Sequence, residues 1–115
     1  MTDLGFPPHR RLKRRSEFKK VYETGGKLIG RHLVLFFLPN PDAPTRLGIT
    51  ATRKNGSATV RNRLKRLARE GFRLRPRPDG LSVVVNFRAG APDGSFDEIR
   101  TDLDRLLERA AKREP

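Results

Sequence analysis

Residues 58–74 read ATVRNRLKRLAREGFRL and place apolar side chains at the spacing of an α-helix. With about 3.6 residues per turn, these positions form one stripe, which is predicted to pack inward. The stripe consists of Val60, Leu64, Leu67, Ala68 and Phe72. Strand patterns stand on either side, RLGITAT at 46–52 and LSVVVNF at 81–87. Since a strand–helix–strand unit can join parallel neighbours, we expect an α/β fold built around this unit.

The sequence before this unit predicts a helix and two further strands. Ser16 is expected to cap a short helix, which ends at Gly25-Gly26. Residues 27–30 form a short extended piece, and the almost wholly apolar run at 32–38 predicts a buried strand. In the strand at 46–52, alternation assigns one face to the core and leaves a small, polar face on the other side.

The sequence after the unit predicts one more helix. Ser95 and Glu98 form a capping box, and the apolar spacing that follows is typical of an amphipathic helix running to about Lys112. The predicted order is therefore α-β-β-β-α-β-α. Such an order indicates a small α/β fold of the α+β sandwich type, with mixed strand directions.

Positive charge is the strongest signal in the composition. Lys and Arg number 26 against 13 Asp and Glu, a net charge of +13. Residues 9–20 and 53–77 hold 17 of the 26 basic side chains. A chain so charged repels itself unless a polyanion neutralises it, and nucleic acid is the expected partner. The last helix differs, since its five basic and five acidic side chains balance and indicate a solvated face without RNA contact.

Length and composition predict one domain in the cytoplasm. We expect residues 1–8 to form a flexible lead-in and residues 9–113 to form a single RNA-binding α/β domain. No apolar stretch approaches the roughly 20 residues of a membrane span, and no signal-like segment follows the N-terminal charges, so no membrane contact is expected. The chain has no Cys, and His9 and His32 stand far apart, so no metal site is predicted.

Catalysis by the chain itself is not predicted. A metal-dependent nuclease needs converging carboxylates or histidines, and acid–base catalysis needs paired titratable groups. The acids inside the basic segments are Glu17 and Glu70, far apart in sequence.

The sequence contains more side chains suited to RNA binding than to catalysis. Lys65 and Arg69 are i, i+4 neighbours that repel each other unless an anion lies between them. Phe18, Tyr22 and Phe36 could stack on unpaired bases beside the polar strand face. Core packing is the commoner role of an aromatic side chain at such positions, and it stays open as the alternative.

Residues 61–70, RNRLKRLARE, preceded by RKNG at 53–56, resemble the RNR signature of the bacterial ribonuclease P protein component. Residues 11–25 look like the first helix of that family, and 46–54 match its central strand. The similarity extends over roughly residues 10–107 at matching order and spacing. It is therefore more specific than a basic patch.

The sequence departs from the family pattern at a few positions. The family usually has an aliphatic residue where Asn55 stands, Asn at Ser57 and Val at Thr59. Near the end of the last strand the family often has Arg where Phe87 aligns, and here Arg88 is adjacent. These departures leave the signature itself intact.

The resemblance implies a fold and an activity. The fold would be an α/β sandwich like ribosomal protein S5 domain 2, with the signature helix in a left-handed β-α-β crossover. The activity would be that of the protein subunit of ribonuclease P, which assists endonucleolytic removal of the 5′ leader from precursor tRNA. The catalyst would be a large RNA subunit, and Mg²⁺ would be held mainly by that RNA and by the substrate. No protein partner is predicted.

Carried over residue by residue, the resemblance implies two sets of side chains that contact RNA, and no catalytic residue or metal ligand. The set that would face the RNA subunit is Arg53, Lys54, Arg61, Asn62, Arg63 and Arg66. The set that would line a cleft for the single-stranded leader is Phe18, Tyr22, Phe36, Lys65 and Arg69.

Two other hypotheses remain open on the sequence. A structural RNA-binding protein, such as a ribosome-associated module, would be equally basic, and leader-dependent affinity for precursor tRNA would distinguish the two. A protein-only nuclease would require Mg²⁺-dependent cleavage by the purified protein free of RNA.

Overall fold

The computed structural model describes residues 11, 12, 14–40, 45–74, 80–89 and 95–112. The predicted lead-in at 1–8 and the predicted domain end at 113 lie outside these residues. The elements in chain order are α1 (Arg15–Thr24), β1 (Gly26–Ile29), β2 (Leu33–Pro39), β3 (Arg46–Thr50), the short 3₁₀ helix η2 (Arg53–Asn55), α2 (Ala58–Leu74), β4 (Leu81–Phe87) and α3 (Phe96–Lys112). The predicted α-β-β-β-α-β-α order is confirmed.

The predicted start of the first helix is wrong. Ser16 lies inside the first turn of α1, and the helix begins at Arg15. The Glu17 carboxylate accepts a hydrogen bond from the backbone N–H of Arg14 at 3.1 Å, so an acidic side chain within the first turn satisfies the N-terminus. The predicted helix end is confirmed, because Gly25 follows the last turn.

The four strands form one mixed sheet in the order β1-β2-β4-β3. The β1–β2 and β2–β4 pairs are antiparallel, and β3 and β4 are parallel neighbours joined through α2. The predicted strand–helix–strand unit is therefore confirmed, while the left-handedness of its crossover stays a prediction. The strand predicted at 32–38 lies one residue too early, since β2 runs from Leu33 to Pro39, and the strand predicted at 46–52 was two residues too long, since β3 stops at Thr50.

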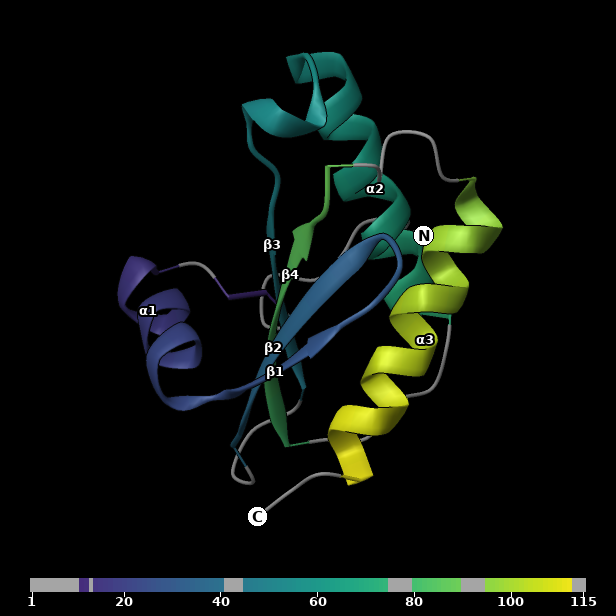
Figure 1. The fold of residues 1–115 in the computed structure, drawn as a ribbon. Helices are drawn as coiled ribbons and strands as arrows, with labels where there is room; N and C mark the ends of the chain where they lie inside the picture. The colour runs from purple at the N-terminus through teal and green to yellow at the C-terminus, as the bar shows by residue number, and fades with distance from the viewer. Residues whose placement is uncertain (1–10, 13, 41–44, 75–79, 90–94, 113–115) are drawn as a thin grey trace, which may run out of the picture.

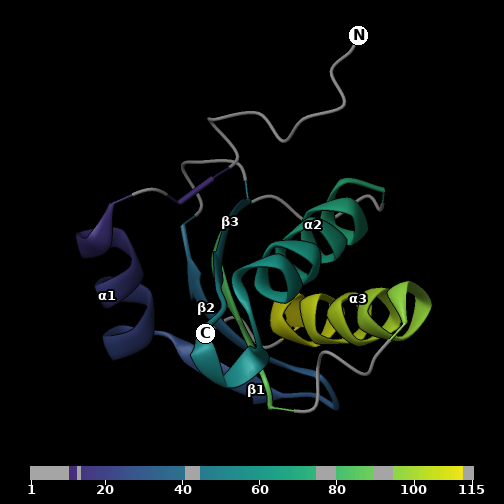
Figure 2. The same ribbon diagram turned by 90° about the horizontal axis from the view of Figure 1, so that it is seen from above.

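Helices cover both faces of the sheet. Figures 1 and 2 show α2 and α3 on one face and α1 on the other. The main core lies under α2 and α3, where Leu64, Phe72 and Leu103 are almost completely buried against the sheet. A smaller cluster under α1 contains Val21 and Val84. The inward stripe predicted for α2 is confirmed, and it leaves the charged faces of that helix outside.

No helix within the described residues combines the length and apolarity that a membrane crossing requires.

Candidate RNA interface

The basic helix α2 and the preceding η2 present positive charge outward. The buried side of α2 is fixed by Leu64 and Ala68, both inaccessible to solvent. Of the residues predicted to face the RNA subunit, Arg61 is half-buried and the others are exposed. The exposed members are Arg53, Lys54, Asn62, Arg63 and Arg66. This surface can contact phosphates through several donors at once.

One flank of α2 gathers half-buried cations. Arg61, Lys65 and Arg69 follow one another at i, i+4 and i+8, and all three are half-buried. Desolvation by burial, and then the positive charge of Arg11, lower the pKa of Arg69. Arg11 pairs with Leu47 in a bridge along β3, so this flank of α2 faces the β3 edge of the sheet. An anion bound between Arg11 and Arg69 would relieve their repulsion.

The three predicted aromatic residues lie together on the α1 face of the sheet. The Tyr22 and Phe36 rings meet edge to face, with centroids 4.8 Å apart. The Lys27 Nζ lies 5.7 Å from the centroid of the Phe36 ring. The Phe18 ring covers Gly48, where a Cβ atom would come within 2.6 Å of it. Phe18 and Phe36 are half-buried and Tyr22 is 36% exposed, so the rings pack on the core and still offer surface.

Two polar side chains that are not in the predicted leader set lie beside these rings. The Tyr22 hydroxyl donates to Asn86 Oδ1 at 2.9 Å and lies 3.4 Å from Thr50 Oγ1. Asn86 interrupts the apolar run of β4, which was the available signal in the sequence. Its position beside Thr50 in the sheet register could not be read from the sequence.

The structure brings the members of the predicted leader set into two groups. The aromatic residues lie on the α1 face, while Lys65 and Arg69 lie on α2, and β3 runs between them (Figure 2). A hollow of about 190 Å³ beside α1 has none of the predicted leader residues in its lining. One cleft holding all five residues therefore stays a prediction.

The turn at which the sequence departs from the family is held by a buried amide. Asn55 is only 2% exposed. Its Oδ1 accepts from the N–H of Thr52 at 3.0 Å, and its Nδ2 donates to the carbonyls of Phe87 and Arg88 at 3.4 and 3.0 Å. Ser57 Oγ accepts from the N–H of Val60 near the start of α2. The Asn55 side chain thus holds η2 against the end of β4 and contacts protein.

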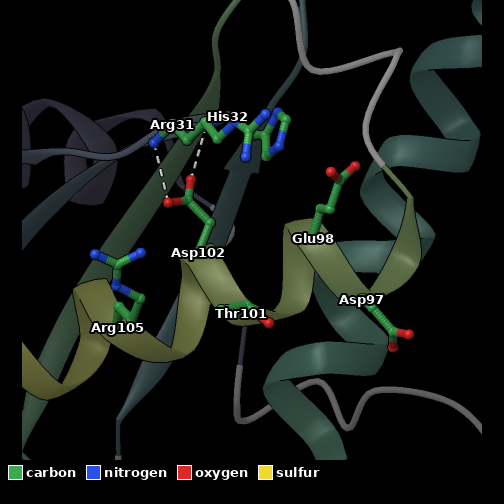
Figure 3. A pocket seen from close by; sticks show the side chains of 7 residues that line it. All are labelled: Arg31, His32, Asp97, Glu98, Thr101, Asp102 and Arg105. Carbon is green, nitrogen blue, oxygen red and sulfur yellow. Dashed lines mark hydrogen bonds between the residues drawn. The ribbon is translucent and has the colours of Figure 1, made fainter.

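The expectation that the acids of the last helix form only a solvated face is wrong for Asp102. This side chain is 6% exposed. Its carboxylate accepts the backbone N–H groups of Arg31 at 3.0 Å, His32 at 2.8 Å and Leu33 at 3.0 Å. Figure 3 shows it pointing from α3 into the turn between β1 and β2. The carboxylate therefore holds the backbone that leads into β2, which starts at Leu33, one residue later than predicted.

The remaining acids near the basic surface have structural partners. Glu17 forms a 2.8 Å ion pair with Arg46, and Glu70 forms a 2.7 Å pair with Arg73. The backbone N–H of Ser95 donates to Glu98 at 2.9 Å, which confirms the predicted capping box and is the largest cause of the lowered pKa of Glu98. Within the described ranges, no three His, Cys, Asp or Glu side chains are grouped as a metal site requires.

Comparisons with known proteins agree with this geometry. A family model described as Ribonuclease P matches residues 6–111. The ribonuclease P protein component of Symbiobacterium thermophilum is 44% identical over 103 residues, covering 87% of this chain and 90% of that protein. The RNase P protein structure from Thermotoga maritima is 36% identical with a TM-score of 0.79, covering 86% of this chain and 96% of that one. The Staphylococcus aureus RNase P protein is 29% identical with a TM-score of 0.80, covering 88% and 94%.

Proposed function

Because the chain belongs to the ribonuclease P protein family, we propose that it acts as the protein subunit of ribonuclease P. In this role it binds the catalytic RNA subunit and the 5′ leader of precursor tRNA, and it assists endonucleolytic removal of the leader. The observation that carries the proposal is the outward-facing cationic surface of η2 and α2, held on a core that the family's sequence pattern predicts. A cytoplasmic location belongs to the same proposal, because both RNA partners are found there.

The outward-facing residues of η2 and α2 bind the RNA subunit. Guanidinium groups suit this role because each presents several N–H donors to phosphate oxygens. Asn62 adds an amide that can donate and accept hydrogen bonds. The members of this surface are Arg53, Lys54, Arg61, Asn62, Arg63 and Arg66. The buried Asn55 amide supports the role of η2, because it fixes the backbone from which Arg53 and Lys54 project.

The leader passes the aromatic group and the α2 flank. Tyr22, with Phe18 and Phe36, offers partly exposed rings on which unpaired bases can stack. Lys65 and Arg69 supply positive charge for the leader phosphates. The lowered pKa of Arg69, caused first by burial and then by the neighbouring cation Arg11, is compatible with this role, since a bound phosphate stabilises the charged guanidinium.

Mg²⁺ supplies the electrophilic chemistry of phosphodiester hydrolysis when it is bound, and we assign it to the RNA subunit and the substrate. The side chains of this protein bind and position RNA. Leader contacts raise the affinity for precursor over mature tRNA, and neutralised phosphates allow closely packed RNA to retain its ions at lower Mg²⁺ concentration.

Reconstitution tests the proposal. The protein is added to a bacterial ribonuclease P RNA, and cleavage of precursor tRNA is compared with RNA alone at low Mg²⁺ and moderate salt. We expect faster cleavage and tighter binding of precursor than of mature tRNA. Equal cleavage with and without the protein would refute the function, and equal affinity for the two tRNA forms would favour a structural RNA-binding protein.

A further inference from the structure

Several segments meet at one end of the sheet. Ile29, Val34, Asn86 and Thr50 are paired neighbours in one row across the four strands. The turn between β1 and β2, the residue after β4 and the 3₁₀ helix η2 all lie just beyond this row. They are therefore close in space although they are far apart in sequence (Figure 1).

Hydrogen bonds connect these segments from η2 to α3. The Asn55 amide donates to the carbonyl of Arg88 at 3.0 Å. Arg88 in turn donates through its backbone N–H to the His32 carbonyl and through Nη1 to the Gly30 carbonyl, both at 2.8 Å. The Asp102 carboxylate holds the same turn from the α3 side. The predicted RNA-subunit surface at η2 is thus bonded to the β1–β2 turn and to α3.

A cationic groove lies where this connection reaches α3. It has a volume of about 180 Å³, and its wall includes Ile29, Arg31, Arg105 and Arg109. The three guanidinium-bearing side chains are exposed, and none of them forms an ion pair with a described carboxylate. Ile29 is 58% exposed, a large apolar side chain open to solvent beside the arginines. The groove therefore offers hydrogen-bond donors for phosphates next to an apolar contact surface.

Acidic side chains lie near one end of the groove. Asp102 is part of the wall, but its two oxygens already accept three backbone N–H groups. A neighbouring hollow of about 220 Å³ shares Arg31 and Arg105 and adds Asp97 and Glu98 (Figure 3). These two carboxylates would repel phosphates near the start of α3, so the groove is open to an RNA strand only on its side toward Arg109.

We propose that this groove binds the sugar–phosphate backbone of the RNA subunit, as a continuation of the surface at η2. The inference rests on the proposed function. Arg31, Arg105 and Arg109 contact successive phosphates, and Ile29 packs on the adjoining ribose or base. The RNA subunit is the expected occupant because the groove is joined to η2 through Arg88, whereas the aromatic leader residues lie on the α1 face. The last helix was predicted to face solvent because its charges balance. In this proposal it carries part of the RNA interface.

A charge-matched pair of variants tests the groove. One variant combines Arg31→Gln, Arg105→Gln and Arg109→Gln. The control combines Arg15→Gln, Lys19→Gln and Lys20→Gln, and it removes the same positive charge from exposed positions on α1, which covers the opposite face of the sheet. Binding to a bacterial ribonuclease P RNA is measured over a salt titration, and thermal unfolding confirms that both variants are folded. The slope of log K against log salt is negative. We expect the groove variant to reduce its magnitude by about 2 to 3, whereas the control reduces it by about 1 or less.

Binding of precursor and mature tRNA distinguishes the possible outcomes. We expect the preference of the holoenzyme for precursor over mature tRNA, measured with the RNA subunit saturated, to be unchanged in the groove variant. Equal slopes and affinities for the two variants would overturn the proposal, as would a loss confined to precursor tRNA. If the parent protein fails to bind the RNA subunit, the proposed function and the inferred occupant both fail. If it binds and stimulates cleavage but the variants behave alike, the groove alone is refuted.

Discussion

Asp102→Ala removes a carboxylate that accepts three backbone N–H groups of the turn between β1 and β2. The N–H groups of His32 and Leu33 are buried, whereas that of Arg31 is partly exposed and can bond to water. A hydrogen bond to a charged group contributes roughly 1.5 to 3 kcal/mol, so losing the two buried ones should lower the free energy of unfolding by about 3 to 6 kcal/mol. Small domains have roughly 5 to 15 kcal/mol in total, so the variant should be close to unfolding.

Asp102→Asn and a control on the same helix refine this prediction. An amide oxygen can still accept from His32 and Leu33, while the NH₂ group faces the Arg31 N–H, so we expect a smaller loss of about 1 to 2 kcal/mol. The exposed Glu108→Ala should change stability by about 0.5 kcal/mol or less. Urea unfolding followed by circular dichroism at fixed pH and salt measures all three. The reasoning fails if Asp102→Ala resembles Glu108→Ala, or if Asp102→Asn is as damaging as Asp102→Ala.

The remaining predictions concern the RNA interface. Lys65→Ala with Arg69→Ala should weaken precursor tRNA binding to the holoenzyme by about 2 kcal/mol, roughly thirty-fold, with little change for mature tRNA; equal losses would move both residues out of the leader path. Arg69→Gln alone should leave urea stability unchanged or slightly higher, because burial and a neighbouring cation disfavour its charge; a loss above about 1 kcal/mol would contradict this. Since the folded-state pKa of Arg69 is lowered, its charge opposes folding below that pKa and this effect fades only as pH rises through it, so no pH dependence is expected near neutrality. Tyr22→Ala should cost about 1 to 3 kcal/mol of leader affinity, whereas Tyr22→Phe keeps the ring and loses only its bond to Asn86, so equal effects in a leader-binding titration would exclude stacking. Asn55→Ala should lower the free energy of unfolding by about 2 kcal/mol, and an unchanged urea midpoint would show that its bonds contribute nothing.

Periodicity predicted the framework because apolar spacing is a local property of the chain. The stripe on α2, the alternation in β3 and the apolar run of β4 indicate which segments are buried, whatever their distant partners are. The role of Asp102 could not be predicted in this way, since its three partners lie about 70 residues earlier in the chain. The same limit applies to Asn86 and Asn55, whose hydrogen bonds depend on the register of β4 with other segments. Polar side chains that form hydrogen bonds with segments distant in sequence therefore cannot be recognised from helical or strand periodicity.

The amide of Asn55 changes how η2 is held. An aliphatic side chain at this position would hold the turn by packing, which restricts distance but tolerates small rotations. Hydrogen bonds to two successive carbonyls, at the end of β4 and at Arg88, fix orientation as well, because their strength falls steeply when they are misaligned. Arg88 is bonded on its other side to Gly30 and His32. We therefore expect a displacement of η2 to shift the β1–β2 turn as well, so that the cations of η2 and the groove beside α3 meet an RNA surface together.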